Sequence, residues 1–125
     1  MSRLTLPAVL ITLLLVGAPS ARAQPATQAD QGHQLFEQHC ASCHGNDGRG
    51  NGFAITVLAM TGLVRRPVDF TNAAAMKRWT DEQLAQVIGK GGKATGKSSA
   101  MPAYGDKLTA HDIADLVVYI RSLSK

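Results

Sequence analysis

The chain has 125 residues, a length that allows one compact domain with a single core. Its formal charge at pH 7 is +4, which is too small for a protein that binds nucleic acid through its overall charge. Only six residues are aromatic, so few large rings are available to fill an interior, and a bulky apolar cofactor would supply what they lack. Composition therefore excludes a second core and a general nucleic-acid binder.

The first 23 residues have the three parts of a secretory signal peptide. Arg3 supplies a positive start, residues 8–16 are continuously apolar, and residues 21–23 (ARA) have the small-residue pattern of a cleavage site. The apolar stretch is shorter than the roughly 20 residues of a spanning helix, which disfavours an uncleaved anchor. We expect export to the periplasm and a mature chain that begins at Gln24 and does not span the membrane. Cleavage removes two of the 13 basic residues, which against 9 acidic ones lowers the formal charge from +4 to +2.

Residues 24–29 form a polar stretch that we expect to be a flexible tail, followed by one domain over residues 30–125. The first helix is predicted from Asp30, a suitable N-cap residue. Small, apolar and site residues then recur at helical spacing and predict the face that packs in the core: Gly32, Leu35, Phe36, His39 and Cys40.

The middle of the chain begins with a glycine-rich loop, residues 45–52 (GNDGRGNG). No strand precedes these glycines, so a phosphate-binding loop is not indicated. Residues 53–64 are apolar but too few to cross a membrane, and we expect them to line an interior. Pro67 ends whatever element precedes it.

Two later helices have clear start signals. Thr80 is a suitable N-cap with Gln83 at the N3 position of a capping box, and this helix is predicted to end at Gly89. Thr109 is likewise a suitable N-cap, with Asp112 at N3, and the last helix is predicted over residues 110–123. A hydrophobic staple accompanies each start: Trp79 with Leu84, and Leu108 with Ile113. No segment shows the alternation of a half-buried strand, so the predicted fold class is all-α with three main helices.

The residues Cys40-Ala41-Ser42-Cys43-His44 match the C-x-x-C-H pattern of covalent c-type haem attachment. Cysteines three apart at a helix end lie on one side, where each thiol can add to a haem vinyl group, and the histidine then reaches the iron as a ligand. Three other readings stay open. A thioredoxin-like pair would need a βαβ pattern that the sequence lacks, zinc would need a fourth ligand such as His39, and the pattern could arise by chance.

Met101, which precedes Pro102 in a polar loop before the last helix, is the best candidate for the opposite iron ligand. A loop can carry the thioether to the open face of the iron, and Met/His ligation raises the reduction potential. Three histidines of predicted helices are candidates of lower rank: His33, His39 and His111. The methionines Met60 and Met76 lie in the middle segment.

Together these features resemble the class I cytochrome c family over nearly the whole mature chain. The matching positions are Gly32, Phe36, Leu116 and Tyr119 on a crossing helix pair, Cys40 to His44, Trp79 to Glu82, Met101-Pro102 and Tyr104-Gly105. The resemblance implies a cytochrome c fold wrapped around one haem, with Trp79 hydrogen-bonded to a haem propionate. The family often has Gly-Pro-x-Leu after the haem motif, and its proline carbonyl accepts a hydrogen bond from the proximal histidine; here Pro67 is the best substitute.

The resemblance implies periplasmic one-electron transfer through a His/Met-ligated haem, with redox proteins as donor and acceptor. No paired acids, nucleophile or base indicate an enzyme. The first alternative is a haem subunit of a larger dehydrogenase or oxidase, and the second is a haem enzyme or gas sensor with an open axial site. Lysines before Met101 would ring the haem edge and attract an acidic partner, unless they only keep the loop soluble: Lys90, Lys93 and Lys97.

Overall fold

The computed structural model describes residues 24–124, so the predicted signal peptide and Lys125 lie outside the described residues. The described part contains helices and no strand, which confirms the all-α prediction. Its helices are α1 (Gln28–His39), α2 (Ala41–His44), α3 (Phe53–Ala59), α4 (Ala73–Met76), α5 (Asp81–Ala94) and α6 (Ala110–Leu123). The three long ones, α1, α5 and α6, are the three main helices that the sequence predicts. Within residues 24–124, no helix is long and apolar enough to cross a membrane.

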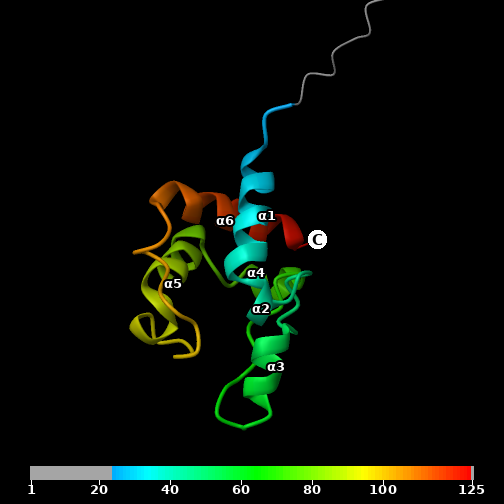
Figure 1. The fold of residues 1–125 in the computed structure, drawn as a ribbon, viewed down its shortest axis with the longest axis vertical. Coiled ribbons are helices and arrows are strands. Elements are labelled where there is room, and N and C mark those ends of the chain that lie inside the picture. The colour runs from blue at the N-terminus through cyan, green and yellow to red at the C-terminus, as the bar shows by residue number, and fades with distance from the viewer. Residues whose placement is uncertain (1–23, 125) are drawn as a thin grey trace, which may run out of the picture.

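The helices α1 and α6 cross at close range and form the centre of the core (Figure 1). A Cβ atom added to Gly32 would collide with the backbone carbonyl of Asp115, so only glycine allows the helices to approach this far. Phe36 of α1 and Leu116 of α6 are fully buried at the crossing. The ring of Phe36 packs on that of Tyr119, with their centroids 5.2 Å apart. This is the crossing that the sequence predicts.

The helix α1 begins earlier than predicted, because its N-cap is Thr27 and not Asp30. The carboxylate of Asp30 accepts a hydrogen bond of 2.9 Å from the backbone N–H of Thr27, and the Thr27 hydroxyl accepts one of 3.2 Å from the N–H of Asp30. Asp30 therefore acts from the N3 position, where two unpaired backbone donors are satisfied at once. Gln28 and Ala29, placed by the sequence in a flexible tail, belong to this helix.

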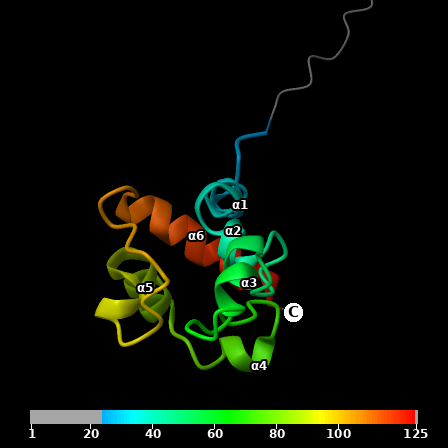
Figure 2. The ribbon, with the colours of Figure 1, turned by 60° about the horizontal axis from the view of Figure 1, so that its bottom comes forward.

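The end of α5 also differs from the prediction. The helix continues past Gly89 and breaks at Gly91, whose φ of 80° and ψ of 165° are readily adopted only by glycine. The carbonyls of Ile88 and Gly89 accept hydrogen bonds from the N–H groups of Tyr104 and Gly105, at 3.0 Å and 2.9 Å. The returning loop thus caps the end of the regular helix, because these two carbonyls accept from the loop and not from the next helical turn. The helix α5 packs against α6, apart from α2 and α3 (Figure 2).

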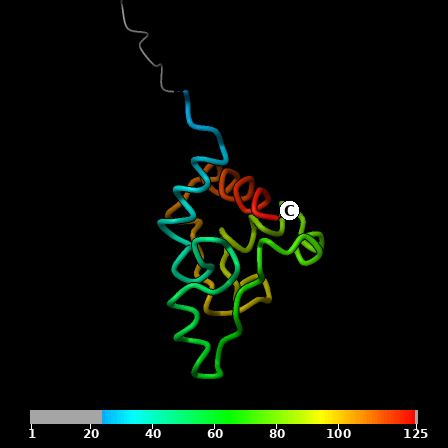
Figure 3. Tube along the Cα trace, turned by 90° about the vertical axis from the view of Figure 1, so that its right-hand side faces the viewer, coloured from blue at the N-terminus to red at the C-terminus, as the bar shows by residue number. Residues whose placement is uncertain are grey.

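The prediction that residues 53–64 line an interior is confirmed only in part, because Ile55, Leu63 and Val64 line the large cavity described below and the rest of the segment does not. Ile55 is buried, with 3% of its surface exposed, whereas Phe53, Met60 and Leu63 are 83%, 84% and 88% exposed. The reason is geometric: α3 packs mainly on α2, so only one side of this short helix is covered by another helix. The helix and the loop after it form the end of the molecule away from the N-terminal segment (Figure 3).

Candidate haem site

One cavity of about 680 Å³ brings together residues from the whole length of the domain. Its size lies within the range of small-molecule and cofactor sites. All six site residues predicted from the sequence line it: Cys40, Cys43, His44, Pro67, Trp79 and Met101. The remaining lining is largely apolar and contains no Asp or Glu, while Arg65, Arg66 and Lys97 are its cationic members. The cavity can therefore take a large apolar group that carries acidic substituents.

The two cysteines lie where α1 ends and α2 begins. Cys40 is the C-cap of α1 and is buried, Cys43 is partly buried, and neither forms a disulfide. Burial, with a smaller contribution from the neighbouring Cys43, raises the pKa of the Cys40 thiol to about 12. Thiol–disulfide exchange requires a thiolate, which a lowered pKa provides. The raised pKa, and the absence of strands from the described residues, argue against the thioredoxin-like reading.

His44 is fixed by its backbone and by its ring. The backbone N–H of His44 donates to the carbonyl of Cys40 at 2.9 Å, and the backbone carbonyl of His44 accepts from the N–H of Gly50 at 2.7 Å. The imidazole stacks on Phe70, with 4.8 Å between centroids and 12° between planes. Burial lowers the pKa of His44 to about 4, so the ring is neutral at pH 7 and keeps a lone pair for a metal.

The predicted hydrogen bond between His44 and Pro67 is not made in this structure. The Nδ1 atom of His44 is buried and has no hydrogen-bond partner among the described residues. The carbonyl oxygen of Pro67 instead lies against Gly50, where it leaves no room for a Cβ atom. Pro67 therefore contributes to the cavity wall and not to the orientation of the imidazole.

Met101 lies on a loop that is tied to α5. Its carbonyl accepts a hydrogen bond of 2.9 Å from Gly92, and its N–H donates to Ser98 at 3.2 Å. The other methionines of the described residues do not line the cavity, because Met76 is buried in the core and Met60 is exposed. Met101 is thus the thioether that shares the cavity with His44.

Of the lower-ranked histidines, His39 lines the cavity and the other two do not. The imidazole of His33 lies 3.4 Å from Glu37, and that of His111 lies 3.5 Å from the buried Asp115. In the part of the chain that the structure describes, no three His, Cys, Asp or Glu side chains are arranged to hold a metal ion. The zinc reading therefore gains no support from the geometry.

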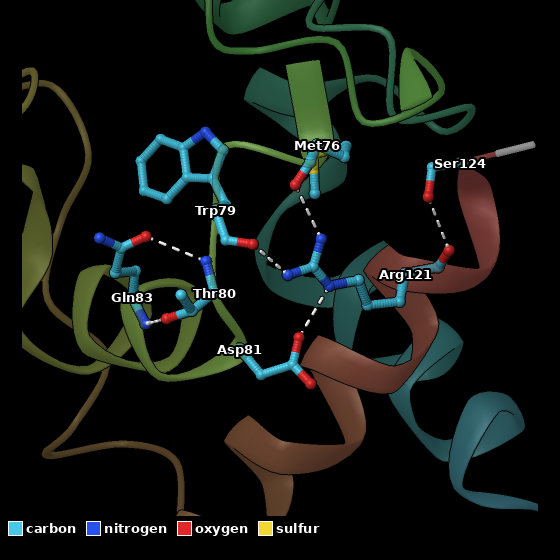
Figure 4. A network of polar contacts seen from close by, with 7 residues as sticks. All are labelled: Met76, Trp79, Thr80, Asp81, Gln83, Arg121 and Ser124. Carbon is cyan, nitrogen blue, oxygen red and sulfur yellow. Dashed lines mark hydrogen bonds and ion pairs between the residues drawn. The ribbon is translucent and has the colours of Figure 1, made fainter. Parts of the chain in front are cut away.

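Trp79 stands in the cavity wall between two basic side chains. The Nζ atom of Lys97 lies 4.9 Å from the centroid of the indole ring. On the side of the backbone away from the indole ring, the guanidinium of Arg121 donates to the backbone carbonyl of Trp79 (Figure 4). The sequence did not indicate a role for Arg121, since this residue lies 42 positions after Trp79 and belongs to no local motif.

Tyr104 is a second residue whose role the sequence did not indicate. Its hydroxyl donates a hydrogen bond of 2.8 Å to the carbonyl of His39 and so links the loop of Met101 to the end of α1. Burial raises the pKa of Tyr104, which keeps the donating proton in place.

The three lysines of the proposed docking surface are exposed but not equivalent. Lys97 lines the cavity, and Lys90 and Lys97 both line a groove of about 470 Å³ beside Trp79, together with Arg78. Lys93 lines neither space. The basic residues at the cavity are therefore Lys97 and two arginines that the prediction did not include, Arg65 and Arg66.

Comparison with known proteins gives concordant results. A family model described as "Cytochrome C oxidase, cbb3-type, subunit III" matches residues 27–120. The chain is 32% identical over 111 residues to cytochrome c55X of Paracoccus denitrificans (strain Pd 1222), with 89% of each chain covered. It matches the solved structure of the KustC0563 c-type cytochrome with a TM-score of 0.57 and 30% identity, over 75% of this chain and 98% of that one. A point variant of that cytochrome matches with a TM-score of 0.55 and 30% identity, over 75% and 99% of the two chains.

The residues of the cavity fit the cofactor of these relatives. Two cysteine thiols can form thioether bonds, and a neutral imidazole and a thioether are ligands suited to haem iron. Cationic side chains without any carboxylate suit the two acidic substituents of haem. The chain therefore belongs to the class I c-type cytochromes, and its cofactor is one covalently bound haem c.

Proposed function

We propose that this cytochrome is a one-electron carrier whose haem is attached through Cys40 and Cys43 and ligated by His44 and Met101. The supporting observation is the single cavity that these four side chains line. When bound, haem supplies an iron that exchanges one electron between its ferrous and ferric states. The buried, neutral imidazole of His44 offers its lone pair, Met101 offers a soft sulfur from the loop, and the apolar lining excludes water.

The carrier acts in the periplasm under this proposal. The support is the signal-like segment of residues 1–23, which lies outside the described residues, and the chemistry of the site. Thioether attachment requires both cysteines as free thiols, and neither forms a disulfide. The proposal excludes catalysis by the chain alone, and it assigns electron donor and acceptor to other redox proteins.

The decisive experiment concerns the axial ligand. If Met101 is the axial ligand, the ferric protein should have the weak red absorption band that reports a bond between iron and a thioether sulfur. Met101→Ala should abolish this band and let carbon monoxide bind the ferrous form readily. Met60→Ala is the matched control, because that side chain is 84% exposed and does not line the cavity. A band that is absent from wild type, or that survives in Met101→Ala, would show that the assignment is wrong.

Covalent attachment has its own test. Cys40→Ala combined with Cys43→Ala should remove haem staining from a denaturing gel, while Ser42→Ala, between the two cysteines, should retain it. A stained band from the double variant would contradict thioether attachment.

A second candidate function is that of a haem subunit in a larger oxidoreductase. Two observations favour it: the description of the matching family model, and the concentration of exposed apolar side chains on and after α3. A subunit would copurify with its partner at constant stoichiometry from native membranes solubilised in mild detergent. Recovery of the holoprotein alone from the soluble periplasmic fraction would support the free carrier.

A further inference from the structure

The guanidinium of Arg121 clamps the connection between α4 and α5 (Figure 4). Its Nη1 atom donates to the carbonyl of Met76 at 2.9 Å, and its Nε atom contacts the carboxylate of Asp81 at 2.7 Å. Its Nη2 atom donates to the carbonyl of Trp79 at 2.5 Å. One side chain of α6 thus holds the end of α4, the backbone of Trp79 and the start of α5.

The two carbonyl contacts, and not the ion pair, are the contacts through which Arg121 fixes the backbone between α4 and α5. Asp81 is 66% exposed, and such a surface ion pair contributes little because water screens it. The side chain of Arg121 is 30% exposed, and its contacts to Met76 and Trp79 are partly buried. Hydrogen bonds from a charged donor to backbone carbonyls in such a position are short and directional, so they fix the backbone.

The backbone of Trp79 is fixed on both sides as a result. Its N–H donates to the carbonyl of Met76 at 3.1 Å, and its carbonyl accepts from Arg121. The indole extends from this fixed backbone into the cavity wall, where Lys97 lies over its ring. The indole N–H and the ammonium are donors of the kind that stabilise the carboxylates of haem.

We propose that Arg121 is a positioning residue that holds Trp79 in the wall of the haem cavity and thereby sets the reduction potential. The ferric state carries one more positive charge than the ferrous state. A carboxylate that loses a donor stabilises the ferric state, which lowers the potential. The inference rests on the proposed electron-carrier function, and it assigns to Arg121 an effect that passes through Trp79 and not through its own charge.

Three variants of the holoprotein separate position from charge. Arg121→Lys keeps the charge, but a single ammonium cannot span the three acceptors. Arg121→Gln removes the charge as well as the ability to span the three acceptors. Asp81→Asn removes the ion pair and leaves the two carbonyl contacts. The proposal predicts a lower potential for both Arg121 variants and an unchanged potential for Asp81→Asn. An effect of charge alone predicts a wild-type potential for Arg121→Lys and a raised potential for Asp81→Asn.

The second readout is the fluorescence of Trp79, the only tryptophan of the chain. Energy transfer to haem quenches this emission steeply with distance, so its lifetime reports the position of the ring. Both Arg121 variants should change the lifetime, and Asp81→Asn should not. The potential must then be measured in a Trp79→Phe background, where Arg121→Lys should have no further effect.

Three results would overturn the inference: a wild-type potential in Arg121→Lys, an Arg121→Lys effect that persists in Trp79→Phe, or a Trp79→Phe potential equal to wild type. If Arg121→Gln does not fold, Arg121→Lys and Asp81→Asn carry the comparison, with far-UV circular dichroism as the check of folding. Wild type without covalent haem, or without the iron–thioether band, would instead contradict the proposed function.

Discussion

The hydroxyl of Tyr104 donates a hydrogen bond of 2.8 Å to the backbone carbonyl of His39, across 65 positions of the chain. His39 is the last residue of α1 and directly precedes Cys40, while Tyr104 follows Met101 in its loop. One hydrogen bond therefore joins the part of the chain that attaches haem to the part that carries the proposed distal ligand.

Removal of this bond should loosen the loop of Met101. A partly buried hydrogen bond of this kind contributes about 1 kcal/mol, so Tyr104→Phe should raise the affinity of the ferric protein for imidazole by roughly fivefold. The change is measured by titration of the Soret band. Tyr119→Phe, at the helix crossing, is the matched control and should bind imidazole as wild type does. Equal affinities in all three proteins would show that the bond does not restrain the loop.

The helix crossing predicts a large difference between two glycines. Gly32→Ala should lower the free energy of unfolding by about 1–3 kcal/mol, because its Cβ would displace the backbone at Asp115. Gly89→Ala is the control: its Cβ would lie 3.6 Å from Ile113, an ordinary contact, and alanine favours a helix interior by about 1 kcal/mol. Guanidinium unfolding of the holoproteins measures both. Similar midpoints for the two variants would contradict the close approach.

The acidic capping residues predict how stability falls in acid. The side chain and backbone of Thr109 donate to Asp112 and hold the pKa of that carboxyl below its ordinary value of 3.8. The folded state therefore binds this proton less readily than the unfolded state does. The stabilisation is complete above the unfolded pKa and is lost as pH falls through the lower folded pKa.

Asp112→Asn should accordingly lose stability at neutral pH and show a shallower decline between about pH 5 and pH 2. Denaturant unfolding at a series of pH values gives both slopes. Ser122→Ala, in α6, removes no ionisable group and is the control that should keep the wild-type slope. An unchanged slope in Asp112→Asn would exclude the cap as a source of acid sensitivity.

The position of Lys97 predicts unequal effects of the three lysines on electron transfer. Lys97 lines the cavity and Lys93 does not, so Lys97→Gln should slow oxidation by the anion ferricyanide more than Lys93→Gln does. The same variants should speed oxidation by a cationic cobalt complex. Both effects should shrink as ionic strength rises and the Debye length falls below about 10 Å. Stopped-flow rates independent of charge and salt would remove the lysines from the docking proposal.

Local patterns in the sequence predicted the starts of α5 and α6, because a capping box requires only residues within one turn. The start of α1 was misplaced because the prediction used only the N-cap preference of Asp30. Thr27 and Asp30 form the same kind of capping box as Thr109 and Asp112, so this pattern was also present within one turn of the sequence. The end of α5 depends on amides of residues 104 and 105, which no window around Gly89 contains.

The candidate site was predicted where chemistry fixes short spacing, as in Cys40 to His44. Contacts between distant segments were missed because no fixed spacing relates their residues. Arg121 meets the carbonyl of Trp79 across 42 positions, and that acceptor carries no side-chain signature. The exposure of the segment after Gly52 could not be predicted either, since the sequence of an apolar run does not show whether another part of the fold covers it.

The crossing of α1 and α6 determines when the core can form during synthesis of the chain. The helix α1 packs mainly on α6, so the N-terminal helix cannot complete its packing until Leu116 and Tyr119 have been synthesised. A chain that emerges N-terminus first would therefore stay open for nearly its full length. In an exported chain this delay would leave the two cysteines of the proposed attachment site accessible to haem until the last helix is available for packing.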